Sequence, residues 1–372
     1  MLIGVPKEIK NNEFRVGLTP NSAAELVHHG HEVWVEAGAG VGSGLTDAEY
    51  VAAGARIAAT ADEIFARADM IVKVKEPLTV ERKKLRRGQI LFTYLHLAPD
   101  LPQTQDLIAS GATCIAYETV TSANGGLPLL TPMSEVAGRL APQVGAHALE
   151  KAQGGRGVLL GGVPGVPSAE VVIIGGGVSG THAATIAAGM GANVTVVDKS
   201  NEALKRIDAQ FGGLVHTAYS TRAALAELVK KADLLIGAVL VPGAAAPKLI
   251  TKAMLPTMKP GAVIVDIAID QGGCCETSHA TTHADPTYVV DGVVHYCVAN
   301  MPGAVARTST FALNNATLPF ALALADKGWK QALSDDPHLR AGLNVHDGKL
   351  TCEPVAVAHG LAYTPAESVL AG

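Results

Sequence analysis

The stretch Glu170-Val-Val-Ile-Ile-Gly-Gly-Gly-Val-Ser-Gly-Thr-His-Ala-Ala, residues 170–184, decides the fold class of this 372-residue chain. It begins with an apolar run, continues as Gly175-x-Gly177-x-x-Gly180 and ends in an alanine-rich segment with helical character. A second apolar run follows at 193–198 and closes on an aspartate. A strand, a glycine loop, a helix and an acid-ended strand in this order are typical of a dinucleotide-binding βαβ unit.

Each part of this motif has a physical role. Gly175 permits a tight turn, Gly177 lets the backbone approach a pyrophosphate, and Gly180 allows the helix to pack closely on the strand. The expected helix begins near Val178 and Ser179, where free N–H groups and the positive end of the helix dipole favour phosphate groups.

Asp198 closes the second strand, near the spacing of about 20 residues expected for a ribose-binding acid. Its carboxylate can accept hydrogen bonds from both ribose hydroxyls and would repel a 2′-phosphate, which predicts NAD rather than NADP. The adjacent Lys199 weakens that preference slightly. Another glycine-rich run, 38–44, lacks a helix directly after it and an acid at the required distance, so we interpret it as a loop.

Short Val/Ile-rich runs alternate with amphipathic Ala/Leu-rich stretches along most of the chain, which predicts βαβ units around parallel sheets. The expected strands are 2–5, 31–36, 70–75, 90–94, 113–117, 170–174, 193–198, 214–218, 233–239, 262–269 and 294–299. The expected helices include 20–29, 60–67, 101–110, 134–152 and 306–327.

We therefore predict an α/β protein with two Rossmann-like, doubly wound domains and a cleft between them. The tail after about residue 340 is too short to form a third domain and must pack on one already built. We expect an NAD-binding domain, 131–305, inserted into a discontinuous substrate domain formed by 1–130 and 306–372.

Composition excludes several classes of partner. The net charge is −5 and only 4% of the residues are aromatic, so neither a basic field nor a stacking surface for nucleic acid is expected. No apolar run reaches the roughly 18 residues of a membrane span, and the first apolar run breaks at Pro6. Five sparse cysteines indicate a reducing compartment, and the cytoplasm is the simplest expectation.

Charged residues stand where several expected strands end, the edge at which open α/β sheets bind ligands. Arg15 follows the first strand, Lys75 ends another, His96 closes the next, and Asp270 follows the strand 262–269 in the other domain. A guanidinium and an ammonium can hold a small carboxylate, and an imidazole can donate to a carbonyl oxygen. Each residue alone also fits a surface charge or a structural histidine, but their joint placement favours a small-acid site.

The segment 263–276 combines Asp270 with two glycines and the adjacent Cys274 and Cys275. A zinc site would need about four converging ligands, and a thiol nucleophile would need a nearby base and a lowered pKa. Inert cysteines beside a tight turn at Gly272 are the favoured interpretation. We assign no metal.

Long blocks of this chain resemble the alanine dehydrogenase/transhydrogenase α-subunit family, and most of all its L-alanine dehydrogenases. The resemblance covers nearly the whole chain. The blocks include Ile3-Gly-Val-Pro-Lys-Glu, Lys73-Val-Lys-Glu-Pro, Leu91-Phe-Thr-Tyr-Leu-His-Leu-Ala, Asp266-Ile-Ala-Ile-Asp-Gln-Gly-Gly and His295-Tyr-Cys-Val-Ala-Asn-Met-Pro-Gly-Ala-Val.

The resemblance implies reversible oxidation of L-alanine by NAD⁺ and water to pyruvate, ammonia and NADH, by a homohexamer. It implies that Arg15, Lys75 and Asn300 bind substrate and that His96 and Asp270 are the acid/base residues. The motif and the resemblance together place these residues along the cofactor: Ser134, Gly175, Gly177, Val178, Ser179, Gly180, Asp198, Ser220, Val239, Leu240, Ile267, Ala268, Ile269, Asp270, Val298, Ala299, Asn300 and Met301.

Two alternatives stay open at this point. One is the soluble nucleotide-binding subunit of a transhydrogenase, and the other is a catalytically silent NAD(H)-sensing module; neither needs the four strand-end residues. Ala203 and His279 occupy positions where some relatives carry a basic residue, which implies weaker contacts to the adenosine end.

Overall fold

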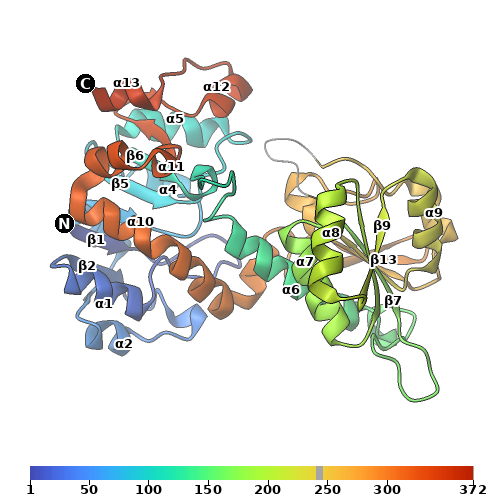
Figure 1. Ribbon diagram of the computed structural model, residues 1–372. Coiled ribbons are helices and arrows are strands. Elements are labelled where there is room, and N and C mark those ends of the chain that lie inside the picture. The colour runs from blue at the N-terminus through green and yellow to red at the C-terminus, as the bar shows by residue number, and fades with distance from the viewer. Residues whose placement is uncertain (240–245, 372) are drawn as a thin grey trace. The chain divides into compact units, whose positions relative to one another are not determined.

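The computed structural model describes residues 1–239 and 246–371, and the chain divides into two compact units (Figure 1). The first unit comprises Met1–Met133 and Val305–Gly372, and the second comprises Ser134–Ala304. The chain leaves the first unit within helix α6 (Thr131–Ala148) and returns to it before helix α10 (Ala306–Asp335). None of the described helices is long and apolar enough to cross a membrane.

The first unit contains an eight-stranded sheet in the order β15-β14-β6-β5-β4-β1-β2-β3. Its strands are β1 (Leu2–Val5), β2 (Glu32–Glu36), β3 (Arg56–Ala58), β4 (Met70–Val72), β5 (Ile90–Thr93), β6 (Thr113–Ala116), β14 (Leu343–His346) and β15 (Lys349–Leu350). β1 to β6 pair in parallel, whereas β14 runs antiparallel to both of its neighbours.

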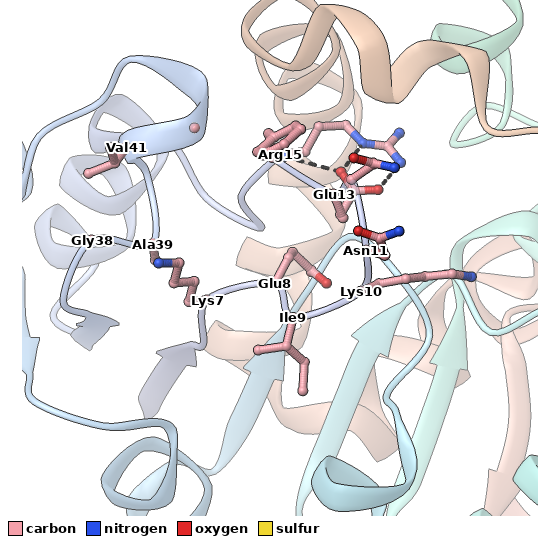
Figure 2. Close-up of a pocket in the computed structure, with 13 residues that line it drawn as sticks. Lys7, Glu8, Ile9, Lys10, Asn11, Glu13, Arg15, Gly38, Ala39 and Val41 are labelled. Carbon is pink, nitrogen blue, oxygen red and sulfur yellow. Dashed lines mark hydrogen bonds and ion pairs between the residues drawn. The ribbon is translucent and has the colours of Figure 1, made fainter. Parts of the chain in front are cut away.

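The direction of strand addition reverses between β1 and β4 in this sheet. β2 and β3 extend it on one side of β1, and β4, β5 and β6 extend it on the other. A reversal of this kind separates the loops at the carboxyl ends and opens a crevice for ligands. The loop after β1 lies here, with Glu8 near its start and Glu13 and Arg15 toward its end (Figure 2).

Several helices of the first unit begin at residues whose side chains cap them. Thr19, Thr46, Thr60 and Asp100 each accept a hydrogen bond from a backbone N–H of the first turn, which satisfies a donor that the helix itself leaves unpaired. These four residues cap α1 (Pro20–His28), α2 (Asp47–Ala52), α3 (Ala61–Arg67) and α5 (Leu101–Ser110). The remaining helices of this unit are α4 (Thr79–Arg82), α11 (Pro337–Arg340), α12 (Glu353–His359) and α13 (Ala366–Ala371).

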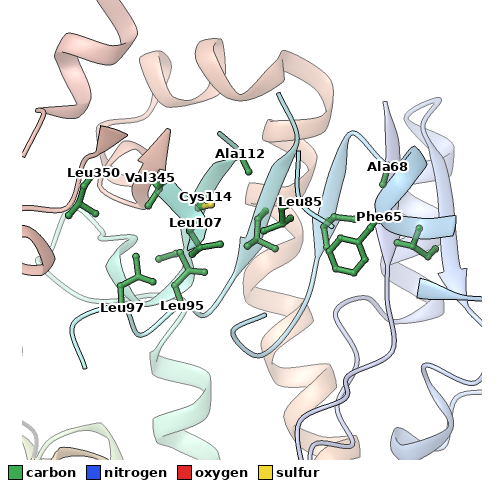
Figure 3. Packing of buried hydrophobic residues seen from close by; sticks show 14 of the residues in the cluster. Phe65, Ala68, Leu85, Leu95, Leu97, Leu107, Ala112, Cys114, Val345 and Leu350 are labelled. Atoms are coloured by element: carbon green, nitrogen blue, oxygen red, sulfur yellow. The ribbon is translucent and has the colours of Figure 1, made fainter. Parts of the chain in front are cut away.

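A continuous apolar cluster connects one side of this sheet to the C-terminal segment (Figure 3). Phe65 and Leu107 from two helices, Leu95 from a loop, and Val345 from β14 all belong to it. The predicted packing of the tail on an existing domain is therefore what the structure contains. Burying such side chains stabilises a fold by about 1.5–3 kcal/mol each.

The second unit contains a seven-stranded sheet in the order β12-β13-β11-β10-β7-β8-β9. Its strands are β7 (Glu170–Ile174), β8 (Asn193–Asp198), β9 (Val215–Tyr219), β10 (Leu234–Gly237), β11 (Val263–Asp266), β12 (Thr287–Val290) and β13 (Val293–Tyr296), and all pairs are parallel except β12 with β13. The main helices are α7 (Val178–Gly189), α8 (Asn201–Phe211) and α9 (Arg222–Lys231). The predicted α/β class with two doubly wound, mainly parallel sheets is confirmed.

Several predicted boundaries were wrong. The strand expected at 262–269 ends at Asp266, because the Asp266 side chain accepts a hydrogen bond from Ala268 N and starts the 3-10 helix η5 (Ile267–Gln271). The strand expected at 70–75 ends at Val72, so Lys75 lies in the loop beyond it. The helix expected to end at 327 continues to Asp335 after a break at Gly328.

Candidate functional site

The glycine loop between β7 and α7 requires two of its glycines for steric reasons. A Cβ at Gly180 would lie 1.8 Å from the carbonyl oxygen of Gly175. Gly175 has a φ of +105°, and a Cβ there would lie 2.7 Å from the carbonyl oxygen of Ala238. These contacts pack the start of α7 against the ends of β7 and β10.

The same loop leaves one side open. A Cβ at Gly177 would meet no atom within 4 Å, and no side chain caps α7, which begins at the exposed Val178. Within residues 1–239 and 246–371, the first N–H groups of this helix thus receive no side-chain cap, and they carry the positive end of the helix dipole. The arrangement fits a bound diphosphate.

Asp198, the acid expected to bind a ribose, also holds the glycine loop through hydrogen bonds. Its Oδ2 accepts a hydrogen bond from Gly176 N at 2.7 Å, and its Oδ1 accepts one from Ser200 N at 2.7 Å. Arg206 Nη2 donates to the carbonyl oxygen of Gly176 at 2.6 Å. The Gly176 residue is thus held through both its N–H and its C=O, a role for Asp198 and Arg206 that sequence patterns did not reveal.

Other predicted cofactor residues gather at the same edge of the second unit. Ser179 Oγ donates to the carbonyl oxygen of Ser134 at 2.9 Å, which joins the start of α7 to α6. Ser220 N donates to the carbonyl oxygen of Asp198 at 2.9 Å, and Val239 follows the end of β10. Leu240, also predicted to line the cofactor, lies outside the described residues.

Asp266 organises the segment that carries Asp270. Its buried carboxylate accepts hydrogen bonds from Cys274 N at 2.9 Å, from Ser278 Oγ at 2.6 Å, and, more weakly, from the N–H groups of Ala268 and Cys275. The turn that carries Asp270 is therefore fixed by Asp266, a residue for which the sequence alone predicted no role.

Asp270 is exposed at the end of this turn. Asn300 N donates to Asp270 Oδ1 at 3.4 Å, a long hydrogen bond that links the segments following β11 and β13, two neighbouring strands. Asn300 has a φ of +60°, a backbone conformation that is uncommon outside glycine. The predicted cofactor residues of these segments are Ile267, Ala268, Ile269, Val298, Ala299 and Met301.

The neighbouring cysteines are buried thiols. Burial, reinforced by the negative charge of Asp266, raises the pKa of Cys274 well above its usual value, and burial also raises the pKa of Cys275. Both side chains are therefore protonated near neutral pH and are poor nucleophiles. Among residues 1–239 and 246–371, no three His, Cys, Asp or Glu side chains converge as metal ligands would.

In the first unit, Arg15 is 2% exposed and is oriented by Glu13. Glu13 Oε1 accepts from Arg15 Nε at 2.7 Å and Glu13 Oε2 accepts from Arg15 Nη2 at 2.6 Å, while Arg15 Nη1 lies 3.1 Å from Met133 Sδ. Burial alone would lower the pKa of Arg15, but Glu13, with smaller contributions from Tyr94 and Glu8, outweighs burial and raises the pKa, so the guanidinium stays charged. A pocket of about 490 Å³ opens beside it, lined by loop 7–15 and by part of the glycine run 38–44 (Figure 2).

His96 is exposed and occupies a left-handed backbone conformation, with a φ of +50°. Glu118 Oε1 accepts a hydrogen bond from His96 N at 2.6 Å, and both Glu118 oxygens accept from Leu95 N at 3.2 Å. The imidazole stacks on the Tyr94 ring, with centroids 5.7 Å apart and planes 9° from parallel. Glu118 follows the end of β6, so the strand-end rule that selected His96 could also have selected Glu118.

Lys75 is half-buried and follows the end of β4. Its backbone is held on both sides, since Lys75 N donates to Glu8 Oε1 at 3.3 Å and Thr93 Oγ1 donates to the Lys75 carbonyl oxygen at 3.0 Å. Arg15, Lys75 and His96 thus follow β1, β4 and β5, three adjacent parallel strands.

Two family models match the chain: "Alanine dehydrogenase/PNT, N-terminal domain" over residues 4–137 and "Alanine dehydrogenase/PNT, C-terminal domain" over residues 141–353. The chain is 64% identical over 370 residues to an alanine dehydrogenase of Halomonas elongata, and the match covers 100% of both chains. The chain belongs to the alanine dehydrogenase/PNT family.

Other members of the alanine dehydrogenase/PNT family confirm the predicted resemblance. The chain is 57% identical to an alanine dehydrogenase of Mycobacterium tuberculosis, again over 100% of both chains. A solved L-alanine dehydrogenase matches with a TM-score of 0.94 and 54% identity, covering 97% of this chain and 99% of that one. A transhydrogenase from Sinorhizobium meliloti matches with a TM-score of 0.81 but only 28% identity, covering 94% and 98%.

The first prediction concerns the glycine loop of this family member. Gly180→Ala should lower Tm by several degrees and weaken NADH binding by about tenfold or more, because the new Cβ forces α7 and the Gly175 carbonyl apart. Thermal unfolding and NADH fluorescence titration measure the two effects. The control, Gly189→Ala, places a Cβ where no atom lies within 4 Å and should leave both unchanged. Equal behaviour of the two variants would refute the steric argument.

The second prediction concerns Asp266. Asp266→Asn should lower the free energy of unfolding by about 3 kcal/mol, because the amide nitrogen is a donor and leaves buried N–H groups without an acceptor. The matched control is Asp270→Asn, an exposed position that should change stability by less than about 0.5 kcal/mol. Urea unfolding of the two variants tests this, and a loss of the same size in both would contradict it.

Proposed function

We propose that this chain catalyses the reversible NAD-dependent oxidative deamination of L-alanine to pyruvate and ammonia. The observation that carries the proposal is the full-length identity of 64% to an alanine dehydrogenase. In this proposal residues 131–305 form the NAD domain, residues 1–130 and 306–372 form the substrate domain, and the enzyme assembles as a homohexamer. The substrate-side residues Arg15, Lys75 and His96 are present at one sheet edge.

The dinucleotide loop supports NAD as the cofactor. The open side at Gly177 and the uncapped start of α7 suit its pyrophosphate, and Asp198 suits the adenosine ribose. Both oxygens of Asp198 already accept a backbone N–H and each keeps further acceptor capacity for a ribose hydroxyl. When bound, NAD⁺ supplies the hydride acceptor of the reaction.

In the proposed mechanism Arg15 binds the substrate carboxylate. Its guanidinium is charged and is held in one orientation by Glu13, so it can fix the position of the substrate Cα. Orientation of this kind accounts for several kcal/mol of many enzymatic barriers. Lys75 binds the carbonyl side of pyruvate, where an ammonium stabilises negative charge that develops on oxygen.

Proton transfers fall to His96 and Asp270 in this mechanism. Oxidation of the amine gives an iminium, to which water adds with loss of one proton. Ammonia then leaves as a proton is delivered to nitrogen and the hydroxyl proton is removed to form the carbonyl. The exposed imidazole of His96 can accept and donate these protons. The Asp270 carboxylate stabilises the positive charge of the iminium or accepts a proton from the attacking water.

The third prediction tests the activity itself. NADH should be oxidised when pyruvate and ammonium are both present, and His96→Ala and Asp270→Asn should each lower kcat by about 100-fold or more while NADH still binds. The decrease in absorbance of NADH measures turnover. His147→Ala, an exposed histidine on α6, is the control and should keep wild-type kcat.

Two results would count against the proposal. Oxidation of NADH by pyruvate without ammonium would indicate a hydroxy-acid dehydrogenase, and hydride transfer only between nucleotides would indicate a transhydrogenase subunit. Near-normal turnover of both variants would remove His96 and Asp270 from the mechanism.

The fourth prediction tests the ribose assignment. Asp198→Ala should weaken NADH and strengthen NADPH relative to it, because the repulsion between a carboxylate and a 2′-phosphate disappears. The ratio of kcat/KM for the two cofactors measures this. Glu202→Ala removes a nearby exposed charge of α8 and should leave the ratio unchanged. An unchanged ratio in Asp198→Ala would exclude that carboxylate as the residue that selects the cofactor.

A further inference from the structure

Lys73 forms a buried ionic group with two acids of the first unit. Its side chain is fully buried, with Nζ 3.0 Å from Glu8 Oε2 and 2.8 Å from Glu81 Oε1. Both carboxylates are buried as well. Removing three charges from water costs several kcal/mol per ion, and only good geometry with further hydrogen bonds offsets that cost. Each acid uses one carboxylate oxygen for Lys73, and its other oxygen accepts further hydrogen bonds.

The two acids use their second oxygens on different segments. Glu8 Oε1 accepts from Val74 N at 2.7 Å and from Lys75 N at 3.3 Å. Glu81 Oε2 accepts from Leu78 N at 2.8 Å, at the start of α4. Glu8 therefore contacts the backbone of a proposed substrate-binding residue, whereas the second oxygen of Glu81 contacts the backbone at the start of a helix.

We infer that Glu8 is a positioning residue for Lys75: its carboxylate bridges the Lys73 ammonium and the Val74–Lys75 backbone, and so sets where the Lys75 ammonium meets substrate. Glu8 and Arg15 belong to the same loop and line the same pocket (Figure 2). The bridge consequently ties the loop that carries the carboxylate-binding guanidinium to the segment that carries the carbonyl-binding ammonium. The inference rests on the proposed role of Lys75 in substrate binding.

Burial opposes the charged forms of this group, and the attraction between Lys73 and its two acids acts against that effect. Burial raises the pKa of Glu8, with Lys73 and the Val74 N–H opposing that shift. Burial alone would lower the pKa of Lys73, but Glu8 and Glu81 outweigh it and raise the pKa, so the ammonium stays charged. A charged Lys73 in turn favours the carboxylate form of its partners.

The bridge requires a carboxylate rather than an amide. A carboxylate has two acceptor oxygens, one for Lys73 and one for the backbone N–H groups. In Glu8→Gln one of those atoms becomes an NH₂ donor, which must face either the Lys73 ammonium or the Val74 and Lys75 N–H groups. Whichever way the amide turns, one side of the bridge is lost.

Glu8→Gln and Glu81→Gln form a matched pair. Each replaces one buried carboxylate that pairs with the Lys73 ammonium, but only Glu8→Gln alters the hydrogen bonds to the Lys75 backbone. In Glu8→Gln we expect the KM for pyruvate to rise about tenfold, with the KM for NADH unchanged. In Glu81→Gln we expect the KM for pyruvate to stay within about twofold of wild type. Steady-state kinetics on the full chain, with Tm measured in parallel, gives these values.

Several results would overturn the inference. A purely structural role would lower kcat through loss of folded enzyme and leave the KM for pyruvate unchanged in both variants. A purely electrostatic role would lower that KM in Glu8→Gln, since removing a negative charge near Arg15 and Lys75 strengthens anion binding. Equal changes of KM in the two variants would also overturn it.

A second pair of variants tests the same inference if the first pair does not fold. If the glutamine variants do not fold, Glu8→Asp and Glu81→Asp keep the charge but shorten the side chain, and the same criterion applies to them. If wild-type enzyme does not oxidise NADH with pyruvate and ammonium, the proposed function fails and this inference falls with it. Equal KM values in an otherwise active enzyme overturn the positioning role alone.

Discussion

Carboxylates that accept backbone N–H groups fix the loops on which both candidate sites depend. A loop that leaves the carboxyl end of a parallel strand has N–H groups with no partner in the sheet, and buried N–H groups need an acceptor. Glu8, Glu118, Asp198 and Asp266 each supply one or two oxygens to such loops. The residues proposed to meet substrate or cofactor are held indirectly, through these acids.

This arrangement divides the acids of the sites into two groups. Glu8, Glu13 and Asp266 are buried and accept hydrogen bonds from other groups of the protein, while Asp270 is exposed at the end of its turn. Asp198 belongs to both groups, because its half-buried carboxylate holds Gly176 and is also the proposed acceptor of the ribose hydroxyls. A change at Asp198 therefore acts on the hydrogen bonds that hold the glycine loop as well as on the proposed contacts to a ribose.

The sequence predictions for the two sites rest on local rules. The glycine spacing, the acid that closes β8, and the charged residues after strands all depend on short stretches, and from them Gly180, Asp198 and Lys75 were proposed as site residues. Glu8 and Lys73 could not be paired in this way, because 65 residues separate them and only the fold brings them together. Arg206 was missed for a similar reason, since no sequence rule indicates that a side chain of α8 reaches the Gly176 carbonyl. The short strands β3, β14 and β15 and the end of β11 at Asp266 depend on sheet pairing and on a side-chain hydrogen bond that no local pattern predicts.

The pairing of β14 with β6 has a consequence for how the chain folds during synthesis. Leu343 pairs with Ile115, so more than two hundred further residues must be synthesised before β6 can pair with β14. The second unit, in contrast, consists of one continuous segment, Ser134–Ala304, and can close while the edge of β6 is still bare. An unpaired parallel-sheet edge is a template for association with another chain. The nascent protein is therefore most exposed to aggregation between the completion of its second unit and the arrival of residues 343–346, and that interval is when a chaperone would be needed.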